Sequence, residues 1–326
     1  MIFFVTVLRA LAAMIITNSH YVGIYPTDLI ANGGLLGDVI FFAVSGFCLC
    51  NVKQGFPTWY AKRVTRIYPQ VILITLFYLF VGIISVDSKG WLYFLVYPTN
   101  YHFVASIILL YIPFYFIMKL DKLKQNVHFV FLGVLLAQML VYVFLVDKTS
   151  YNIDTVRAPF IRFIFAEAML LGAYFRINLD RFKDKNRLIN WLLLVFFAGV
   201  YFVSKIAFSK WQSISRFQLA NQAALLVLLY FVFRCFAGID SRLERLPKPV
   251  KKIIEFISEI TLEIYLVQIG IIPFFAERFR FPVNWVLLTA TIIAGAFVLH
   301  GAAKLITSGA EKLSGKIIKK EKKTEE

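Results

Sequence analysis

The sequence has few cysteines and few charged residues of either sign. Its three cysteines are Cys48, Cys50 and Cys235, and a Cys-x-Cys pair without further ligands makes no metal site. Charged residues are 17% of the chain and hydrophobic residues 60%, against the ~45–50% apolar residues usual in soluble domains. We therefore expect a membrane protein with free thiols and no metal site.

Acidic residues are scarce beside basic ones, 19 against 35, so the net charge is +16. The basic residues lie in the connections between apolar blocks rather than on one face, so we expect no nucleic-acid partner. No basic residue precedes the first apolar stretch, which Arg9 interrupts. We therefore expect no cleavable signal peptide.

The apolar residues form continuous blocks of membrane-spanning length. They do not alternate with polar residues, which argues against a transmembrane β-barrel. The sequence thus predicts an all-α, polytopic membrane protein with about ten transmembrane helices. The predicted spans are 2–21, 35–50, 70–86, 101–118, 127–146, 159–176, 190–207, 216–235, 255–276 and 283–306.

The distribution of Lys and Arg predicts the orientation of these spans. The side of the membrane that holds both ends of the chain carries 25 basic residues, and the other side carries 8. Both termini are therefore predicted to be cytoplasmic. We divide the chain into an integral membrane domain, 1–310, and a polar, solvated cytoplasmic tail, 311–326.

Two ionisable residues, Arg9 and His20, lie in the first predicted span. On a helix, eleven residues make about three turns plus ~20°, so the two side chains share a face ~16 Å apart along the axis. A charge within a span is costly unless it faces protein, water or a ligand. Two interpretations remain open: a functional pair, or a buried ion pair at Arg9 with an interface histidine at His20.

The second span contains Asp38 near its outer end and a Ser45-Gly46 step. Asp38 is a candidate partner for His20, because both are predicted near the outer side. The small residues at 45 and 46 let a backbone or a ligand approach closely. A simple helix-packing notch explains them as well.

The connection before the third span contains Arg63 and Arg66, and Pro57 and Pro69 are predicted to bracket a short helix there. Side chains three residues apart on a helix project together. Arginine pairs suit phosphate oxygens. The positive-inside rule alone also explains two cytoplasmic arginines.

Taken in order, these segments resemble the acyltransferase family 3 membrane proteins. The similarity rests on Arg9 with His20, on Gly33-Gly-Leu-Leu-Gly-Asp-Val-Ile-Phe-Phe-Ala-Val-Ser-Gly-Phe47, and on Arg63-Val-Thr-Arg-Ile-Tyr-Pro69. Weaker similarity continues in three later segments, which are 101–113, 167–172 and 258–268. The chain departs from the family pattern at Phe103, where Trp is frequent, and at Gln268, where His is frequent.

The resemblance implies transfer of an acyl group, usually acetyl from acetyl-CoA, to a hydroxyl of a cell-envelope glycan or exopolysaccharide at the inner membrane. It implies no tightly bound cofactor. Arg63 and Arg66 would bind the phosphates of the donor, and Arg9 another phosphate or the thioester carbonyl. His20 would act as general base or carry the acyl group, and Asp38 would orient it. Phe41, Phe42, Ser45 and Gly46 would shape the acyl channel. With Arg9 and His20 ~16 Å apart, the extended pantetheine arm is expected to bridge them.

Polar residues within or beside other spans are candidates for binding the acceptor. Gln218, Asn221 and Gln222 share one helical face, and His102 begins the fourth span on the same outer side. Glu167 lies mid-span, as do Gln138 and Glu263. The alternative is that these residues form interhelical hydrogen bonds, and Glu167 or Glu263 is also a candidate counter-ion for Arg9.

Two other functions stay open. A glycan or lipid-linked sugar translocase also has about ten helices with polar mid-span residues. However, such proteins commonly show internal repeats, and none is visible here. A catalytically inactive relative is the third possibility, which the departures at Phe103 and Gln268 keep open and the retention of Arg9 and His20 opposes.

Overall fold

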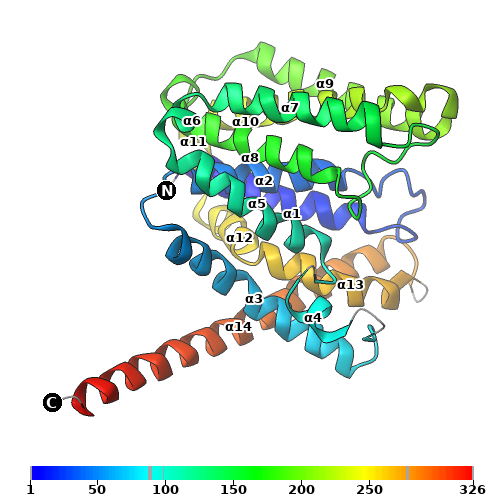
Figure 1. The fold of residues 1–326 in the computed structure, drawn as a ribbon. Helices are drawn as coiled ribbons and strands as arrows, with labels where there is room; N and C mark the ends of the chain where they lie inside the picture. The colour runs from blue at the N-terminus through cyan, green and yellow to red at the C-terminus, as the bar shows by residue number, and fades with distance from the viewer. Residues whose placement is uncertain (1, 87–89, 98, 277–278, 325–326) are drawn as a thin grey trace. The chain divides into compact units, whose positions relative to one another are not determined.

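The computed structural model describes residues 2–86, 90–97, 99–276 and 279–324. All regular secondary structure in these residues is helical, and they contain no β-strand (Figure 1). Apolar side chains and internally paired backbone groups are what a lipid environment requires of a chain. The helices are α1 (Phe3–Ser19), α2 (Gly34–Leu49), α3 (Phe56–Phe80), α4 (Gly90–Leu95), α5 (His102–Lys119), α6 (Asp121–Gln125), α7 (Val127–Leu145), α8 (Ile161–Ile177), α9 (Leu188–Lys210), α10 (Leu219–Ala237), α11 (Asp240–Glu244), α12 (Lys248–Glu259), α13 (Thr261–Ala276) and α14 (Val283–Thr324).

Five of the described helices are long and apolar enough to cross a membrane: α5, α7, α9, α10 and α14. A sixth candidate arises if α12 and α13, interrupted at Ile260, form one broken span. Two shorter helices, α1 and α2, are also apolar. The all-α, multi-pass prediction is therefore confirmed. Each of the ten predicted spans coincides with helical residues, but ten crossings and cytoplasmic termini remain predictions.

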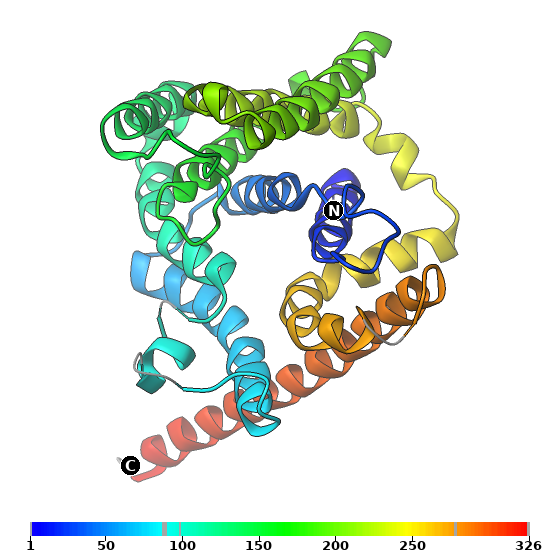
Figure 2. The same cartoon turned by 90° about the vertical axis from the view of Figure 1, so that its right-hand side faces the viewer.

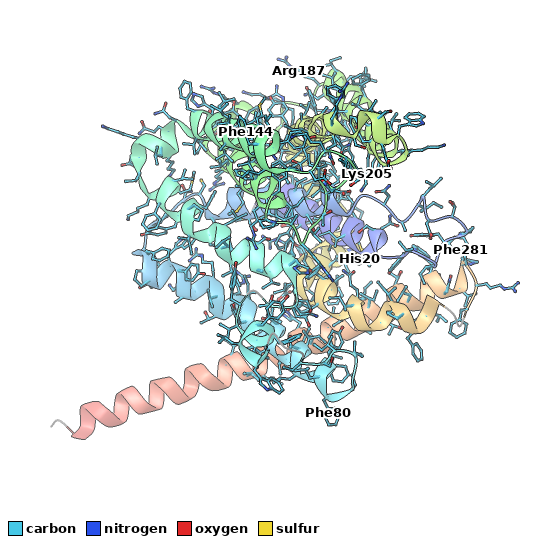
Figure 3. All side chains as sticks on the ribbon, turned by 45° about the vertical axis from the view of Figure 1, so that its right-hand side comes forward. His20, Phe80, Phe144, Arg187, Lys205 and Phe281 are labelled. Carbon is cyan, nitrogen blue, oxygen red and sulfur yellow. The ribbon has the colours of Figure 1, made fainter. Side chains whose placement is uncertain are left out.

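Side chains on these helices agree with lipid exposure. Phe144 on α7 is 75% exposed, and Phe80 at the end of α3 is 89% exposed and lies at the edge of the molecule (Figure 3). On α9, Leu192, Val195 and Phe196 are exposed as well. Large apolar surfaces of this kind are stable only in contact with hydrocarbon or another protein.

Two helix boundaries differ from the sequence prediction. α3 continues through Pro69, so Pro57 and Pro69 do not bracket a separate short helix. A proline within a membrane helix is tolerated because neighbouring groups satisfy the freed carbonyl. α14 runs on to Thr324, so most of the predicted tail at 311–326 continues a helix, and its last two residues lie outside the described range.

The described chain divides into two compact units. Unit 1 comprises 1–19, 32–60 and 102–259, and unit 2 comprises 20–31, 61–101 and 260–326. α3 therefore contributes its first turn to unit 1 and the rest to unit 2. His20, the residue after α1, belongs to unit 2, whereas α1 itself belongs to unit 1.

Unit 1 is organised on a close crossing of α2 and α8. A Cβ atom at Gly46 would overlap the carbonyl oxygen of Met169, and one at Gly172 would overlap that of Ala43. Small residues at such crossings let two helix backbones touch. On the outer part of the unit, α9 and α10 lie side by side in both views (Figures 1 and 2).

The start of α1 is tied to another part of unit 1. The backbone N–H of Phe4 donates to Asp240 Oδ1 (2.7 Å), and Lys183 Nζ pairs with Asp240 Oδ2 (3.3 Å). The N–H groups of a first helical turn have no partner within their own helix. Asp240 supplies one from α11 and so holds the N-terminal end of α1.

Unit 2 contains most of α3 with α4, α13 and α14. Tyr78 on α3 donates to the carbonyl oxygens of Leu266 and Val267 (3.0 and 2.8 Å) and accepts from the N–H of Gly270 (3.1 Å). α13 packs on α14. These contacts join α3, α13 and α14 into the frame that carries the polar residues described next.

Candidate functional site

His20 lies in the turn that follows α1, not in the helix. α1 ends at Ser19, and the His20 side chain is exposed (Figure 3). The prediction that Arg9 and His20 share a face of one continuous helix is thus wrong, because the helix ends one residue before His20. Because His20 is outside the helix, the direction of its side chain is not set by the helical period of about 3.6 residues.

Within unit 2 the imidazole meets Gln268 of α13. Gln268 Nε2 lies 3.4 Å from His20 Nδ1, and the Gln268 side chain is fully buried. A buried amide is a fixed point against which an exposed ring can be oriented. The residue that departs from the expected pattern in this span therefore lies directly at the candidate catalytic histidine.

The segment after His20 is anchored to α14. Tyr21 Oη and Thr289 Oγ1 are 2.9 Å apart, and Asn284 Nδ2 donates to the carbonyl oxygen of Ile24 (3.0 Å). Burial raises the pKa of the Tyr21 phenol, so it stays neutral and can donate or accept. Two fixed points so close in sequence to His20 limit the movement of its backbone.

Arg63 and Arg66 lie in unit 2 on α3, with Arg63 half-buried and Arg66 exposed. Gln70 follows on the same face and donates from Nε2 to Glu263 Oε1 (3.3 Å). His300 Nδ1 on α14 donates to the same oxygen (2.9 Å). The arginine pair is thus on the side of α3 that faces α13 and α14.

Two members of this network, Gln70 and His300, are not among the residues predicted from the sequence. Each is a single polar residue in or beside an apolar run, which is the available signal. Their partner Glu263 is 2% exposed, and Gln70 and His300 belong to unit 2, as Glu263 does. The predicted role of Glu263 as counter-ion of Arg9 has no support from these contacts.

Arg9, half-buried in unit 1, donates from Nη2 to Cys48 Sγ on α2 (3.7 Å). Among the described residues it forms no ion pair. Glu167 is not its counter-ion, because both oxygens of that fully buried carboxyl group have no hydrogen-bond partner in the described structure. The interpretation of Arg9 as half of a buried ion pair is therefore wrong within unit 1.

Asp38 lies on α2 in unit 1 and is 8% exposed. No contact in unit 1 relates it to the chemistry expected at His20. Its role in orienting His20 stays a prediction.

The residues predicted to shape an acyl channel pack in an aromatic cluster of unit 1. Phe103 of α5 lies 4.9 Å from the ring centre of Phe41 and 5.0 Å from that of Phe42, and Phe42 stacks on Phe165 at 4.2 Å. Ser45 is half-buried. The space beside Gly46 is filled by the α8 backbone, which supports the helix-packing interpretation of that glycine.

Three amides at the start of α10 are fully buried and bonded to protein, and the first of them, Gln218, directly precedes the helix. Gln218 Oε1 accepts from the N–H groups of Asn152 and Ile153, Asn221 Nδ2 donates to Tyr201 and Ser204, and Gln222 Oε1 accepts from Gln138. These contacts fit the alternative of interhelical and loop-anchoring bonds. Their role in binding an acceptor stays a prediction, as does that of His102, which begins α5.

The loop between α7 and α8 is held by the same amides. Tyr151 Oη donates to Asn221 Oδ1 (3.2 Å), and Lys205 Nζ pairs with Asp154 Oδ2 (2.9 Å). Burial raises the pKa of the Tyr151 phenol, which therefore remains protonated and keeps this bond. The polar face of α10 thus orders a loop at one end of unit 1.

Of the predicted site residues, His20, Arg63 and Arg66 fall in unit 2, and the others fall in unit 1. A family model described as an acyltransferase domain matches residues 2–301, which cover both units. No curated protein and no solved structure matches the chain significantly. Because the match covers nearly the whole chain and several helices are long and apolar enough to cross a membrane, this chain belongs to the acyltransferase 3 family and is a multi-pass membrane acyltransferase.

Proposed function

We propose that the protein moves an acyl group, most simply acetyl, from cytoplasmic acyl-CoA to a hydroxyl of a cell-envelope glycan or exopolysaccharide at the inner membrane. The observation that carries the proposal is the exposed imidazole of His20, fixed beside Gln268, in a chain of an acyltransferase family. An imidazole is the most frequent general base for taking a proton from a hydroxyl, and it must be accessible and oriented to do so.

In the proposed reaction, His20 takes the proton of the acceptor hydroxyl. The resulting oxygen attacks the thioester carbonyl, the new C–O bond forms and the C–S bond breaks. The coenzyme A thiolate leaves and receives the proton from the imidazolium. A general base of this kind contributes about 10²–10⁴-fold to the rate.

Gln268 would set the tautomer of His20. The amide oxygen and nitrogen occupy equivalent positions, and their assignment follows from the hydrogen-bond network. In the structure the amide nitrogen of Gln268 faces Nδ1, and Nδ1 then accepts. Turning the amide over would place Oε1 toward the ring, where it would accept from Nδ1–H and leave Nε2 of the imidazole with the lone pair that a base needs. A neutral amide orients the ring without raising its basicity as a carboxylate would.

On the donor side, we propose that Arg63 and Arg66 hold phosphates of acyl-CoA. Both stand on one face of α3, and Arg66 is exposed. In the predicted topology this end of α3 is cytoplasmic, where the donor is found. Arg9 is proposed to bind a further phosphate or the thioester carbonyl, with the pantetheine arm extended toward His20 and Asp38 assisting the imidazole.

The two departures from the family pattern both touch a proposed site residue. Phe103 packs on Phe41 and Phe42, which we propose shape the path of the acyl group, and Gln268 meets His20. Ser45 and Gly46 lie on the same helix as these phenylalanines, and the contact at Gly46 makes its part a structural one. We propose that His102 and Glu167 contact the acceptor. We propose that Gln218, Asn221 and Gln222 order the loop between α7 and α8 beside the acceptor.

The experiment that tests the proposal measures donor turnover. The purified protein in nanodiscs is incubated with acetyl-CoA and a crude envelope-glycan fraction, and thiol release is followed. His20→Ala is expected to lower the rate at least 100-fold while folded yield stays unchanged.

His128→Ala is the matched control, because His128 is an exposed histidine at the start of α7, and it should behave as wild type. Equal turnover by His20→Ala and wild type would refute the histidine mechanism. Absence of both thiol release and donor binding in the wild-type protein would favour a translocase or an inactive relative.

A further inference from the structure

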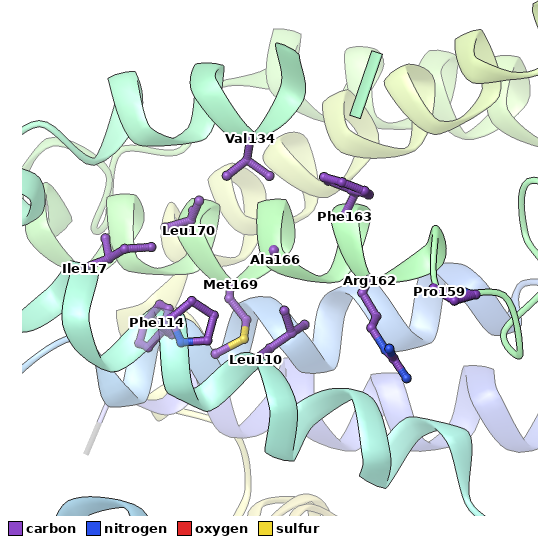
Figure 4. A pocket seen from close by; sticks show the side chains of 11 residues that line it. Leu110, Phe114, Ile117, Val134, Pro159, Arg162, Phe163, Ala166, Met169 and Leu170 are labelled. Atoms are coloured by element: carbon purple, nitrogen blue, oxygen red, sulfur yellow. The ribbon is translucent and has the colours of Figure 1, made fainter. Parts of the chain in front are cut away.

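A pocket with a volume of about 270 Å³ opens between α5, α7 and α8 of unit 1. Its walls are apolar except at one end (Figure 4). Pro159 and Arg162 lie at that end, and Ile117 and Leu170 lie at the other (Figure 4). Residues 162 to 170 span about 12 Å along α8, so the pocket is elongated along the helices.

The helices that form the pocket also carry large exposed apolar side chains, which suit contact with hydrocarbon. Phe116 on α5 and Leu132 and Leu136 on α7 are 49%, 53% and 57% exposed on the same helices. An apolar hollow on such a surface does not stay empty in a bilayer, because lipid chains are the surrounding solvent. Its occupant therefore comes from the membrane.

Arg162 makes this pocket different from an ordinary lipid-facing hollow. Its half-buried side chain lines the pocket and has no ion-pair partner among the described residues. No acidic residue lines the pocket, and the nearest carboxyl group along α8, that of Glu167, makes no hydrogen bond. A cation at the level of a span is costly unless an anion or water neutralises it.

We propose that this pocket binds an anionic phospholipid, with one acyl chain between α5, α7 and α8 and the phosphate on Arg162. The acyl chain matches the apolar walls of the pocket, and the phosphate matches Arg162 at its end. Basic pockets between membrane helices recognise lipid headgroups by this combination. In the predicted topology the lipid belongs to the outer leaflet. The pocket shares no residue with the proposed catalytic and donor-binding set, and its test needs no acyl transfer.

The test is native mass spectrometry of the full chain titrated with dioleoyl phosphatidylglycerol or with dioleoyl phosphatidylcholine, which has the same chains and a neutral headgroup. The wild-type protein should retain the first phosphatidylglycerol more tightly than phosphatidylcholine. Arg162→Ala should lower the phosphatidylglycerol affinity about fivefold and remove the preference. Arg157→Ala removes an exposed charge from the preceding loop and should leave binding unchanged.

A second variant tests the chain-binding part. Ala166→Phe fills the middle of the pocket and keeps Arg162, so the affinity for both lipids should fall. If Arg162→Ala is not recovered folded, the lipid affinity of Ala166→Phe still tests whether the pocket binds a lipid chain. Equal affinity of the wild-type protein for the two lipids, equal loss in Arg157→Ala and Arg162→Ala, or unchanged binding by Ala166→Phe would each overturn the proposal.

Discussion

The crossing of α2 and α8 makes a sharp prediction about Gly46 and Gly172. Gly46→Ala places a methyl group in the space of the Met169 carbonyl oxygen, and Gly172→Ala does the same at Ala43. A backbone carbonyl cannot rotate away as a side chain can, so the helices must separate. Overpacking of this kind costs about 1–3 kcal/mol per site. Separation would also loosen the Phe42–Phe165 stack at the same crossing.

The losses of stability caused by the two substitutions should not be additive. Ala43 and Gly46 are three residues apart, as are Met169 and Gly172, so both clashes lie at one crossing and one separation relieves both. The double variant should therefore lose less stability than the sum of the single variants. The measurement is the free energy of unfolding in mixed detergent–SDS micelles, followed by far-UV circular dichroism.

Gly133→Ala is the matched control for the helix crossing. Gly133 lies inside α7, and a Cβ atom there meets nothing within 4 Å. Because alanine favours a helix over glycine by about 1 kcal/mol, this variant should be unchanged or more stable. If Gly46→Ala and Gly172→Ala are as stable as Gly133→Ala, the close crossing does not exist as described.

Two further predictions concern the proposed reaction. Arg63→Ala and Arg66→Ala should each raise the apparent KM for acetyl-CoA about tenfold, because each removes a charge-assisted hydrogen bond of ~1.5 kcal/mol. Lys62→Ala, an exposed charge on the same helix, should not change it, and an unchanged KM in both arginine variants would return them to a topological role. Gln268→Glu places a carboxylate beside His20, which favours the imidazolium and raises the pKa of the ring. The rise of kcat/KM with pH, which follows loss of the imidazolium proton, should then move to higher pH, and an unmoved profile would remove Gln268 from the site.

The helical character of the chain follows from the sequence because backbone groups have no other partner in hydrocarbon. Each predicted span coincides with helical residues for that reason. The prediction is weakest at boundaries. Pro69 suggests a helix end, but α3 passes through it. His20 suggests a place in the first helix, but α1 ends at Ser19. Local composition does not settle either point, since both depend on neighbouring groups that satisfy the backbone.

The candidate site is only partly visible in the sequence. His20, Arg63 and Arg66 are recognisable because ionisable residues beside apolar runs are rare. His20 and Gln268 are 248 positions apart in the sequence, and Gln70 and Glu263 are 193 positions apart. His300 and Glu263 are 37 positions apart and lie on different helices. No periodicity within one helix relates such positions.

By itself, the sequence determined the membrane setting, the helical class and the residues that stand out chemically, since these depend on composition and on local spacing. Only the tertiary structure decided what each polar or small residue does. Gly46 serves a backbone contact with α8, Gln222 bonds Gln138 and a loop, and Arg162 lines an apolar pocket. The sequence does not decide these roles because a polar group forms a hydrogen bond with whichever partner the fold brings within about 3 Å. That partner commonly lies on a helix far away in the sequence.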